Sequence, residues 1–199
     1  MTFAHTISWN IGVRVRATAE RIRSLGLDAI TDVVPAYTTL AVYFDSTRTS
    51  FASVVAAIAP IMTDHREQQE PETALIEIPA RYDGPDLAEV AKLTGLTPDE
   101  VIDRHSSRTY RAYACGFAPG FAYLGDLDES LILPRRATPR VRVPPGSIAI
   151  AGAQTAVYPL QTPGGWHLIG TTPIAMFDTR RDTPALIRAG DTVRFIRID

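Results

Sequence analysis

The sequence predicts an α+β protein with two parts: a βαββαβ-type unit that lacks its first strand, and a barrel or sandwich of short strands. In residues 1–78, apolar residues recur first with helical and then with strand periodicity. In residues 79–199, short apolar runs alternate with glycine and proline turns, and residues 116–172 hold eight of the chain's 13 glycines. We therefore expect one domain at residues 1–78 and a second at residues 79–199.

The first half shows the order helix, strand, strand, helix, strand. Apolar residues at helical spacing predict a helix over residues 11–25, with Gly26 as its C-terminal cap. Residues rich in β-branched and aromatic side chains predict strands over 29–34 and 38–44. The expected elements that follow are a helix over 51–62, a polar loop over 63–73 and a strand over 74–78. This order is ferredoxin-like without its first strand, so one edge of the sheet is less protected than usual.

The second half begins with two short helices. Asp86 is a capping residue type and predicts a helix to about residue 93. Thr97, Pro98 and Glu100 form a capping box, which predicts a helix as far as Ser106. Short strands between turns follow, and the last is expected over residues 192–198.

Composition excludes several classes of protein. A net charge of −2 and a pI near 6.1 argue against a nucleic-acid or anionic-membrane binder. The sequence has no transmembrane-length apolar run and no signal-peptide layout, so we expect a cytoplasmic protein. The single cysteine, Cys115, and four scattered histidines offer no disulfide and no metal-ligand spacing. We expect no metal, and no cofactor is evident in this chain, which has no phosphate-binding P-loop.

Long motifs of the second half resemble the family of 5-oxoprolinase B subunits, also called allophanate hydrolase subunit 1 or the KipI type. The motifs that carry the resemblance include Gly116-Phe-Ala-Pro-Gly-Phe-Ala-Tyr-Leu-Gly125, Pro134-Arg-Arg136, Pro139-Arg140, Val143-Pro-Pro-Gly-Ser147, Ala151-Gly-Ala-Gln-Thr155, Val157-Tyr-Pro159 and Pro163-Gly-Gly-Trp166. The match is strong after about residue 85 and weak before it.

The resemblance implies a ferredoxin-like domain followed by a cyclophilin-like β-barrel of the carboxyltransferase type. It also implies a non-autonomous part of an enzyme, which acts with the KipA-type C subunit and the A subunit of 5-oxoprolinase. Together these would open 5-oxo-L-proline to L-glutamate with ATP. Two alternatives stay open: a KipI-type module that inhibits a sensor histidine kinase, and a component of an allophanate or urea-type amide hydrolase or carboxyltransferase.

Aromatic residues in glycine and proline turns are the main candidates for a ligand site. Phe117, Phe121 and Tyr123 would form one wall of a pocket, because such rings offer a large apolar area. A second wall would contain Tyr158 and Trp166. The backbone N–H groups near Gly164 and Gly165 suit an anion such as a carboxylate. The alternative is that these rings only close the core of the barrel.

Polar candidates complete the predicted site. Arg140 is expected to contact an anion or a partner, Gln154 to hydrogen-bond the ligand, and His167 to line the same pocket. His105 is a weak candidate for a general acid or base. Each has a structural alternative, and Cys115 fits a buried small residue better than a nucleophile.

Overall fold

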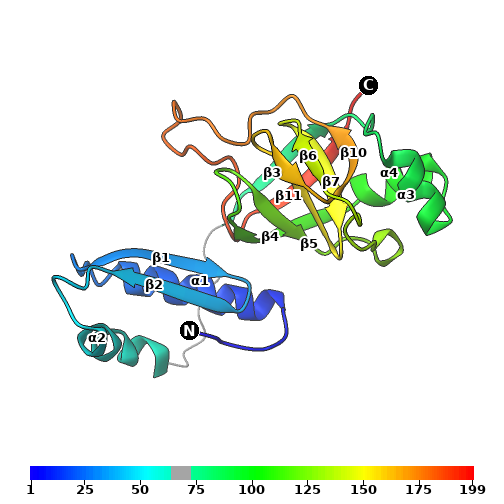
Figure 1. Ribbon diagram of the computed structural model, residues 1–199. Coiled ribbons are helices and arrows are strands. Elements are labelled where there is room, and N and C mark those ends of the chain that lie inside the picture. The colour runs from blue at the N-terminus through cyan, green and yellow to red at the C-terminus, as the bar shows by residue number, and fades with distance from the viewer. Residues whose placement is uncertain (64–72) are drawn as a thin grey trace. The chain divides into compact units, whose positions relative to one another are not determined.

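The computed structural model describes residues 1–63 and 73–199, so the predicted polar loop lies almost wholly outside the described residues. The chain divides into two compact units, Met1–Thr73 and Ala74–Asp199, and each has a hydrophobic core of its own (Figure 1). Within the two described ranges, no helix has the length and apolar character needed to cross a membrane.

The first unit is a β-hairpin with two helices. Its elements are α1 (Trp9–Arg23), β1 (Ile30–Ala36), β2 (Thr39–Phe44) and α2 (Phe51–Thr63). The hydroxyl of Ser8 accepts a hydrogen bond from the N–H of Ile11 at 3.3 Å and so caps the start of α1. Apolar residues from one face of each helix and from the hairpin form its core: Val15, Ala19, Ile22, Val33, Leu40, Val54, Ile58 and Ile61. The predicted element order is confirmed for this part of the chain.

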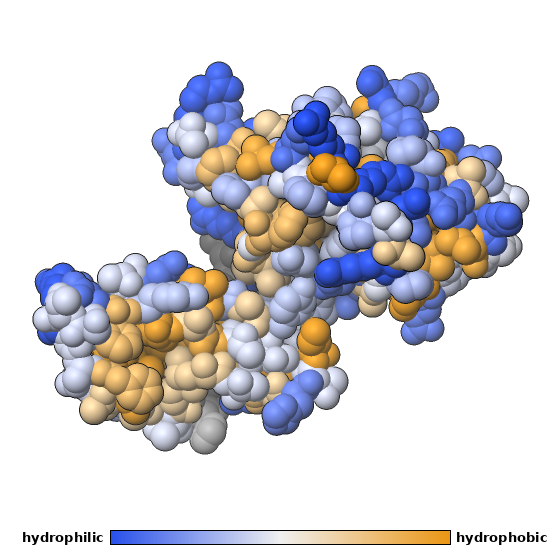
Figure 2. All heavy atoms as spheres, in the orientation of Figure 1, coloured by the Kyte–Doolittle hydropathy of each residue, from blue (hydrophilic) through white to orange (hydrophobic). Residues whose placement is uncertain are grey.

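The outer edge of β2 is open over most of its length. Thr2 forms an isolated bridge with Thr39, and Leu40 exchanges hydrogen bonds with Met1 at 2.8 and 2.9 Å. No further strand among the described residues pairs with this edge, as expected for a unit without its first strand. Figure 2 shows apolar side chains gathered on one face of this unit, and Tyr43, Phe51 and Val55 are among its exposed apolar residues.

The strand predicted at the end of the first domain belongs to the second unit instead. This strand, β3 (Leu75–Ala80), pairs in parallel with β11 (Thr192–Arg197) over its whole length. The structure therefore divides the chain between Thr73 and Ala74, and not after residue 78 as we predicted. Local sequence could not reveal this, because the pattern of a strand does not identify its partner.

The second unit is a barrel of short strands with two helices. Besides β3 and β11 it contains α3 (Leu87–Thr94), α4 (Pro98–Ser106), β4 (Thr109–Cys115), β5 (Ala122–Gly125), the 3-10 helix η1 (Glu129–Leu131), β6 (Arg140–Val143), β7 (Ser147–Ala151), β8 (Gln154–Val157), β9 (Thr162–Gly164) and β10 (His167–Thr171). Seven strands form one sheet in the order β10-β7-β8-β5-β4-β11-β3, and β6 pairs with β9 separately. Arg81, after β3, exchanges backbone hydrogen bonds with Thr171 at 2.8 and 2.7 Å, so the sheet nearly closes.

The strands of the barrel bury a different core on each face. Residues such as Ile150 and Val157 point inward, where all seven strands, α3 and α4 contribute to one large core. Their neighbours Ala149 and Ala156 point outward and pack with Val143 of β6 in a second core. The interior is therefore filled by side chains, and the outer core is where the predicted aromatic residues lie.

Candidate functional site

Four of the five predicted aromatic residues surround the fifth, Phe121. Its ring centroid lies 4.9–5.8 Å from the centroids of the other four rings, each in an edge-to-face arrangement. The four partners are Phe117, Tyr123, Tyr158 and Trp166. They come from separate segments of the chain, so the predicted convergence is present. It lies on the outer face of β7, β8 and β10, however, and not inside the barrel.

The members of this aromatic cluster differ in exposure. Phe121, Tyr158 and Trp166 are buried, so they act mainly as a core. Phe117 is 62% exposed and Tyr123 is half-buried. Phe117 also has a φ of 74°, a backbone conformation that is costly for a bulky residue. A strained loop that holds one phenyl ring in solvent favours a contact with a ligand or a partner at this ring.

Gly164 brings β9 directly against the Tyr158 ring. A Cβ atom at position 164 would lie 2.2 Å from the Tyr158 hydroxyl, so only glycine fits. Gly164 is also the register partner of Arg140 in the β6–β9 pair, which places Arg140 beside the aromatic cluster. Burial raises the pKa of Tyr158, although a hydrogen bond from the Trp166 backbone and the charges of nearby arginines oppose the shift.

Arg140 is held by a buried carboxylate. Its Nη2 donates to Oδ1 of Asp86 at 2.6 Å, and Nη1 of Arg136 donates to the same oxygen at 3.0 Å. The other oxygen, Oδ2, accepts from the backbone N–H of Leu168 at 2.7 Å. Burial alone would raise the pKa of Asp86, but the hydrogen bonds from Arg140 and Leu168 lower it below its ordinary value. Asp86 is therefore ionised and is the centre of a charged cluster.

Asp86 reaches this position because its loop lies flat against β10. Gly84 donates its backbone N–H to the carbonyl of Ile169 at 3.3 Å, and an added Cβ at Gly84 would lie 2.3 Å from the backbone of that residue. Asp86 then donates its own N–H to the carbonyl of Leu168 at 2.9 Å. From the sequence, Asp86 was identified only as a helix cap, because the partners of its side chain lie 50 or more residues away.

Two further candidates lie on opposite faces of the sheet. Gln154 is half-buried, and alternation along β8 places it on the outer face with Ala156, the face of the aromatic cluster. His167 is the register partner of Ile150, so it points to the other face. Its Nε2 donates to the carbonyl of Pro134 at 3.0 Å. The structure does not place His167 with the aromatic cluster.

Gly165, another residue of the predicted site, has room for a side chain, because the nearest atom to an added Cβ would belong to Pro139, at 3.6 Å.

His105 and Cys115 lie in environments unsuited to catalysis. His105 is fully buried among core rings, and its two ring nitrogens lie 2.8 Å from the hydroxyls of Tyr82 and Thr155. Burial lowers the pKa of His105 to about 3, so the imidazole is neutral. Desolvation raises the pKa of the Cys115 thiol to about 11, which disfavours the nucleophilic thiolate. Both observations argue against a catalytic role. Cys115 is nevertheless exposed at the end of β4, so the prediction that it is a buried small residue was wrong.

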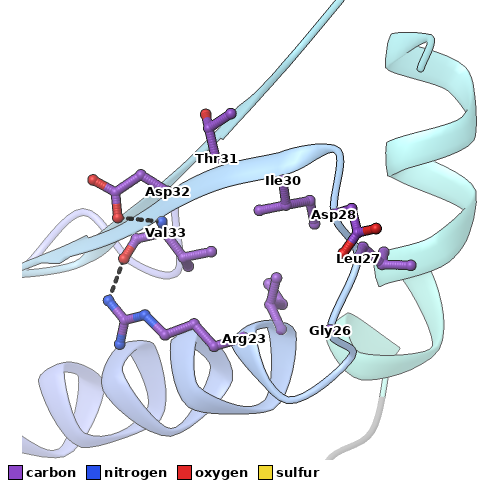
Figure 3. A pocket seen from close by; sticks show the side chains of 9 residues that line it. Arg23, Gly26, Leu27, Asp28, Ile30, Thr31, Asp32 and Val33 are labelled. Carbon is purple, nitrogen blue, oxygen red and sulfur yellow. Dashed lines mark hydrogen bonds between the residues drawn. The ribbon is translucent and has the colours of Figure 1, made fainter. Parts of the chain in front are cut away.

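A separate cavity of about 410 Å³ lies in the first unit, between the end of α1 and β1. Figure 3 shows Arg23 reaching from α1 to the carbonyl of Val33, to which it donates a hydrogen bond. The N–H of Val33 donates to Oδ1 of Asp32 at 2.7 Å. These side chains occupy the outer edge of β1, so they protect it from pairing with another strand. This cavity was not predicted from the sequence. Throughout residues 1–63 and 73–199, no group of three potential metal ligands comes together.

The fold defines a two-unit α+β protein with a carboxyltransferase-type barrel. The family model described as carboxyltransferase domain, subdomain C and D, matches residues 1–187. A 5-oxoprolinase B subunit from Bacillus subtilis (strain 168) is 40% identical over 98% of this chain and 87% of its own length. One from Escherichia coli O157:H7 is 54% identical over 67% of this chain and 62% of its own. The chain belongs to the family of 5-oxoprolinase B subunits.

Solved structures agree with this assignment. TTHA0988 is 39% identical with a TM-score of 0.89, and the match covers 100% of this chain but 39% of that one. The conserved uncharacterized protein PH0987 from Pyrococcus horikoshii is 40% identical with a TM-score of 0.62, covering 100% of this chain and 93% of that one. Urea carboxylase from Kluyveromyces lactis, at 15% identity over 98% of this chain and 20% of that one, has a TM-score of 0.76 and shares the fold alone.

Proposed function

We propose that this chain is the B subunit of an ATP-dependent 5-oxoprolinase that opens the lactam ring of 5-oxo-L-proline to give L-glutamate. The observation that carries the proposal is the 40% identity to a 5-oxoprolinase B subunit over 98% of this chain. The site is consistent with such a substrate. The aromatic cluster offers flat apolar surface to a small ring, and Arg140 beside it offers a cation to a carboxylate.

The chain is proposed to bind and orient the substrate within a complex. His105 is neutral and buried, and the Cys115 thiol stays protonated, so neither supplies a nucleophile or base. The first turns of α3 and α4 carry Glu89, Asp99 and Glu100, which makes these helix starts unfavourable for a triphosphate. We therefore assign ATP binding and activation of the lactam to the two partners, the A subunit and the KipA-type C subunit.

Reconstitution tests this function. The chain is purified alone and together with its two partners, and release of ADP that depends on 5-oxoproline is measured. We expect no turnover by the chain alone and turnover by the complete set. Turnover by the isolated chain would contradict its role as a dependent subunit. No turnover by the complete set would contradict the oxoprolinase assignment and favour the histidine-kinase inhibitor.

A further inference from the structure

The two arginines bound to Asp86 each keep a buried donor without a partner. Nε of Arg136 and Nη1 of Arg140 are buried and have no hydrogen-bond partner among the described residues. Buried donors of this kind are rare, because an unsatisfied polar group loses its hydration without compensation. Such donors indicate a bound group, either water or a ligand with oxygen atoms.

Both donors belong to one charged cluster. Each is part of a guanidinium in which another nitrogen, Nη1 of Arg136 or Nη2 of Arg140, donates to the same oxygen, Oδ1 of Asp86, at 3.0 or 2.6 Å. The chain segments around them are also joined. Arg136 donates its backbone N–H to the carbonyl of Gly165 at 2.7 Å, and Arg140 is the register partner of Gly164. The hydroxyl of Thr162, at the start of β9, is a third buried group without a partner among the described residues.

The charge balance of the cluster favours a bound ligand that carries one negative charge. Asp86 is buried and neutralises one of the two guanidinium groups, whose side chains are each 26% exposed. Glu89 pairs with Arg136 at 2.5 Å but is 49% exposed, so solvent screens it. Arg135 also acts on the Tyr158 hydroxyl, but Arg135 is exposed, so solvent screens its charge as well. One positive charge of the cluster therefore remains without a buried counter-charge, which suits a monoanion better than a dianion.

We propose that Arg136 and Arg140 receive the carboxylate of the small-molecule substrate, and that Asp86 is the residue that positions them. A planar carboxylate has two oxygens that can accept from two guanidinium groups. The aromatic cluster lies beside Arg140, so the ring of the same ligand would meet it. The identity of the substrate as 5-oxoproline rests on the proposed function, but the carboxylate site itself does not.

A pair of ligands and a matched pair of arginine variants test the site. 5-Oxoproline and 2-pyrrolidinone share the lactam ring, and only the first has a carboxylate. Each is titrated against the full chain and against the assembled complex by calorimetry. Arg140→Gln is expected to weaken 5-oxoproline binding about 10–100-fold and to leave 2-pyrrolidinone binding unchanged. Arg142→Gln removes the same charge from an exposed position on β6 and is the control. Equal effects of the two variants would overturn the proposal.

The positioning role of Asp86 has a separate readout. Asp86→Asn removes the charge that holds both arginines, so it is expected to weaken 5-oxoproline binding but not 2-pyrrolidinone binding. Asp86→Glu keeps the charge, so this variant is expected to retain part of the affinity for 5-oxoproline that Asp86→Asn loses. A purely structural residue would change the binding of both ligands alike, and that result would remove the positioning role.

The unmodified chain provides a test that needs no variant. In nuclear magnetic resonance spectra, sodium acetate is expected to shift the Arg136 Nε–H signal at lower concentration than inorganic phosphate does. A stronger response to phosphate would overturn the assignment to a carboxylate, and no response to either would show that water satisfies the donors. A complex without oxoprolinase activity would contradict the proposed function and leave this result intact. An active complex with an unresponsive Arg136 would contradict only the carboxylate site.

Discussion

The hydroxyl of Tyr158 occupies the space that a side chain at Gly164 would need. An added Cβ would lie 2.2 Å from that oxygen, and Tyr158 is too buried to move aside. We expect Gly164→Ala to separate β9 from the aromatic cluster and to destabilise the protein by about 1–3 kcal/mol. Gly165→Ala is the control, because its nearest contact would be an ordinary 3.6 Å. Thermal melts compare the two variants, and equal melting temperatures would contradict the close approach.

His105 should make the protein less stable in acid. Burial lowers its pKa from 6.5 to about 3 in the folded state, so between these values the unfolded state binds the additional proton. The stability contributed by the neutral imidazole is complete above pH 6.5. It is lost at up to about 1.4 kcal/mol per pH unit as pH falls towards 3.

The His105→Gln variant isolates this effect. Denaturant unfolding from pH 7 to pH 4 is expected to show a shallower loss of stability in this variant than in the unmodified protein. His5→Gln, at an exposed position, serves as the control and should keep the steeper slope. The same slope in all three proteins would show that His105 does not stay neutral in the folded state.

The two units should differ in stability when they are separated. Residues 1–73 are expected to melt without cooperativity, because the outer edge of β2 and an apolar face remain uncovered. Residues 74–199 should fold alone. A fragment starting at residue 81 should be much less stable, because it loses β3, whose Ile78 and Ala80 are fully buried. Circular dichroism melts of the three fragments check this, and equal stability of the last two would show that β3 is dispensable.

Gln154 provides a test of ligand binding on the outer face of the barrel, where the aromatic cluster lies. We expect Gln154→Ala to weaken substrate use in the assembled complex by about 1–3 kcal/mol, because hydrogen bonds to the ligand are lost. The melting temperature should hardly change, since Gln154 is half-buried on the outer face. Gln161→Ala, in the exposed loop before β9, is the matched control. Unchanged kinetics of the Gln154 variant would contradict its role in binding the ligand.

Local structure could be predicted from the order of the residues alone. Helix α4 has the predicted capping box, with Glu100 and Thr97 each binding the backbone of the other. The aromatic rings near Phe121 converge as we predicted, but on the outer face of the barrel, and their role in binding a ligand stays a prediction. Caps, turns and periodicity depend on residues close together in the chain, so they can be recognised without knowledge of the fold.

Contacts between distant segments, in contrast, became known only from the folded chain. The fold pairs β3 with β11, so the boundary between the units moved to Thr73. It places the aromatic cluster on the outside of the barrel, because alternation along β7 and β8 sends Ala149 and Ala156 outward. It also makes Asp86 the partner of Arg136 and Arg140, across about 50 residues of chain. Strand pairing and buried ion pairs depend on the whole fold, and a local pattern is compatible with several partners for each.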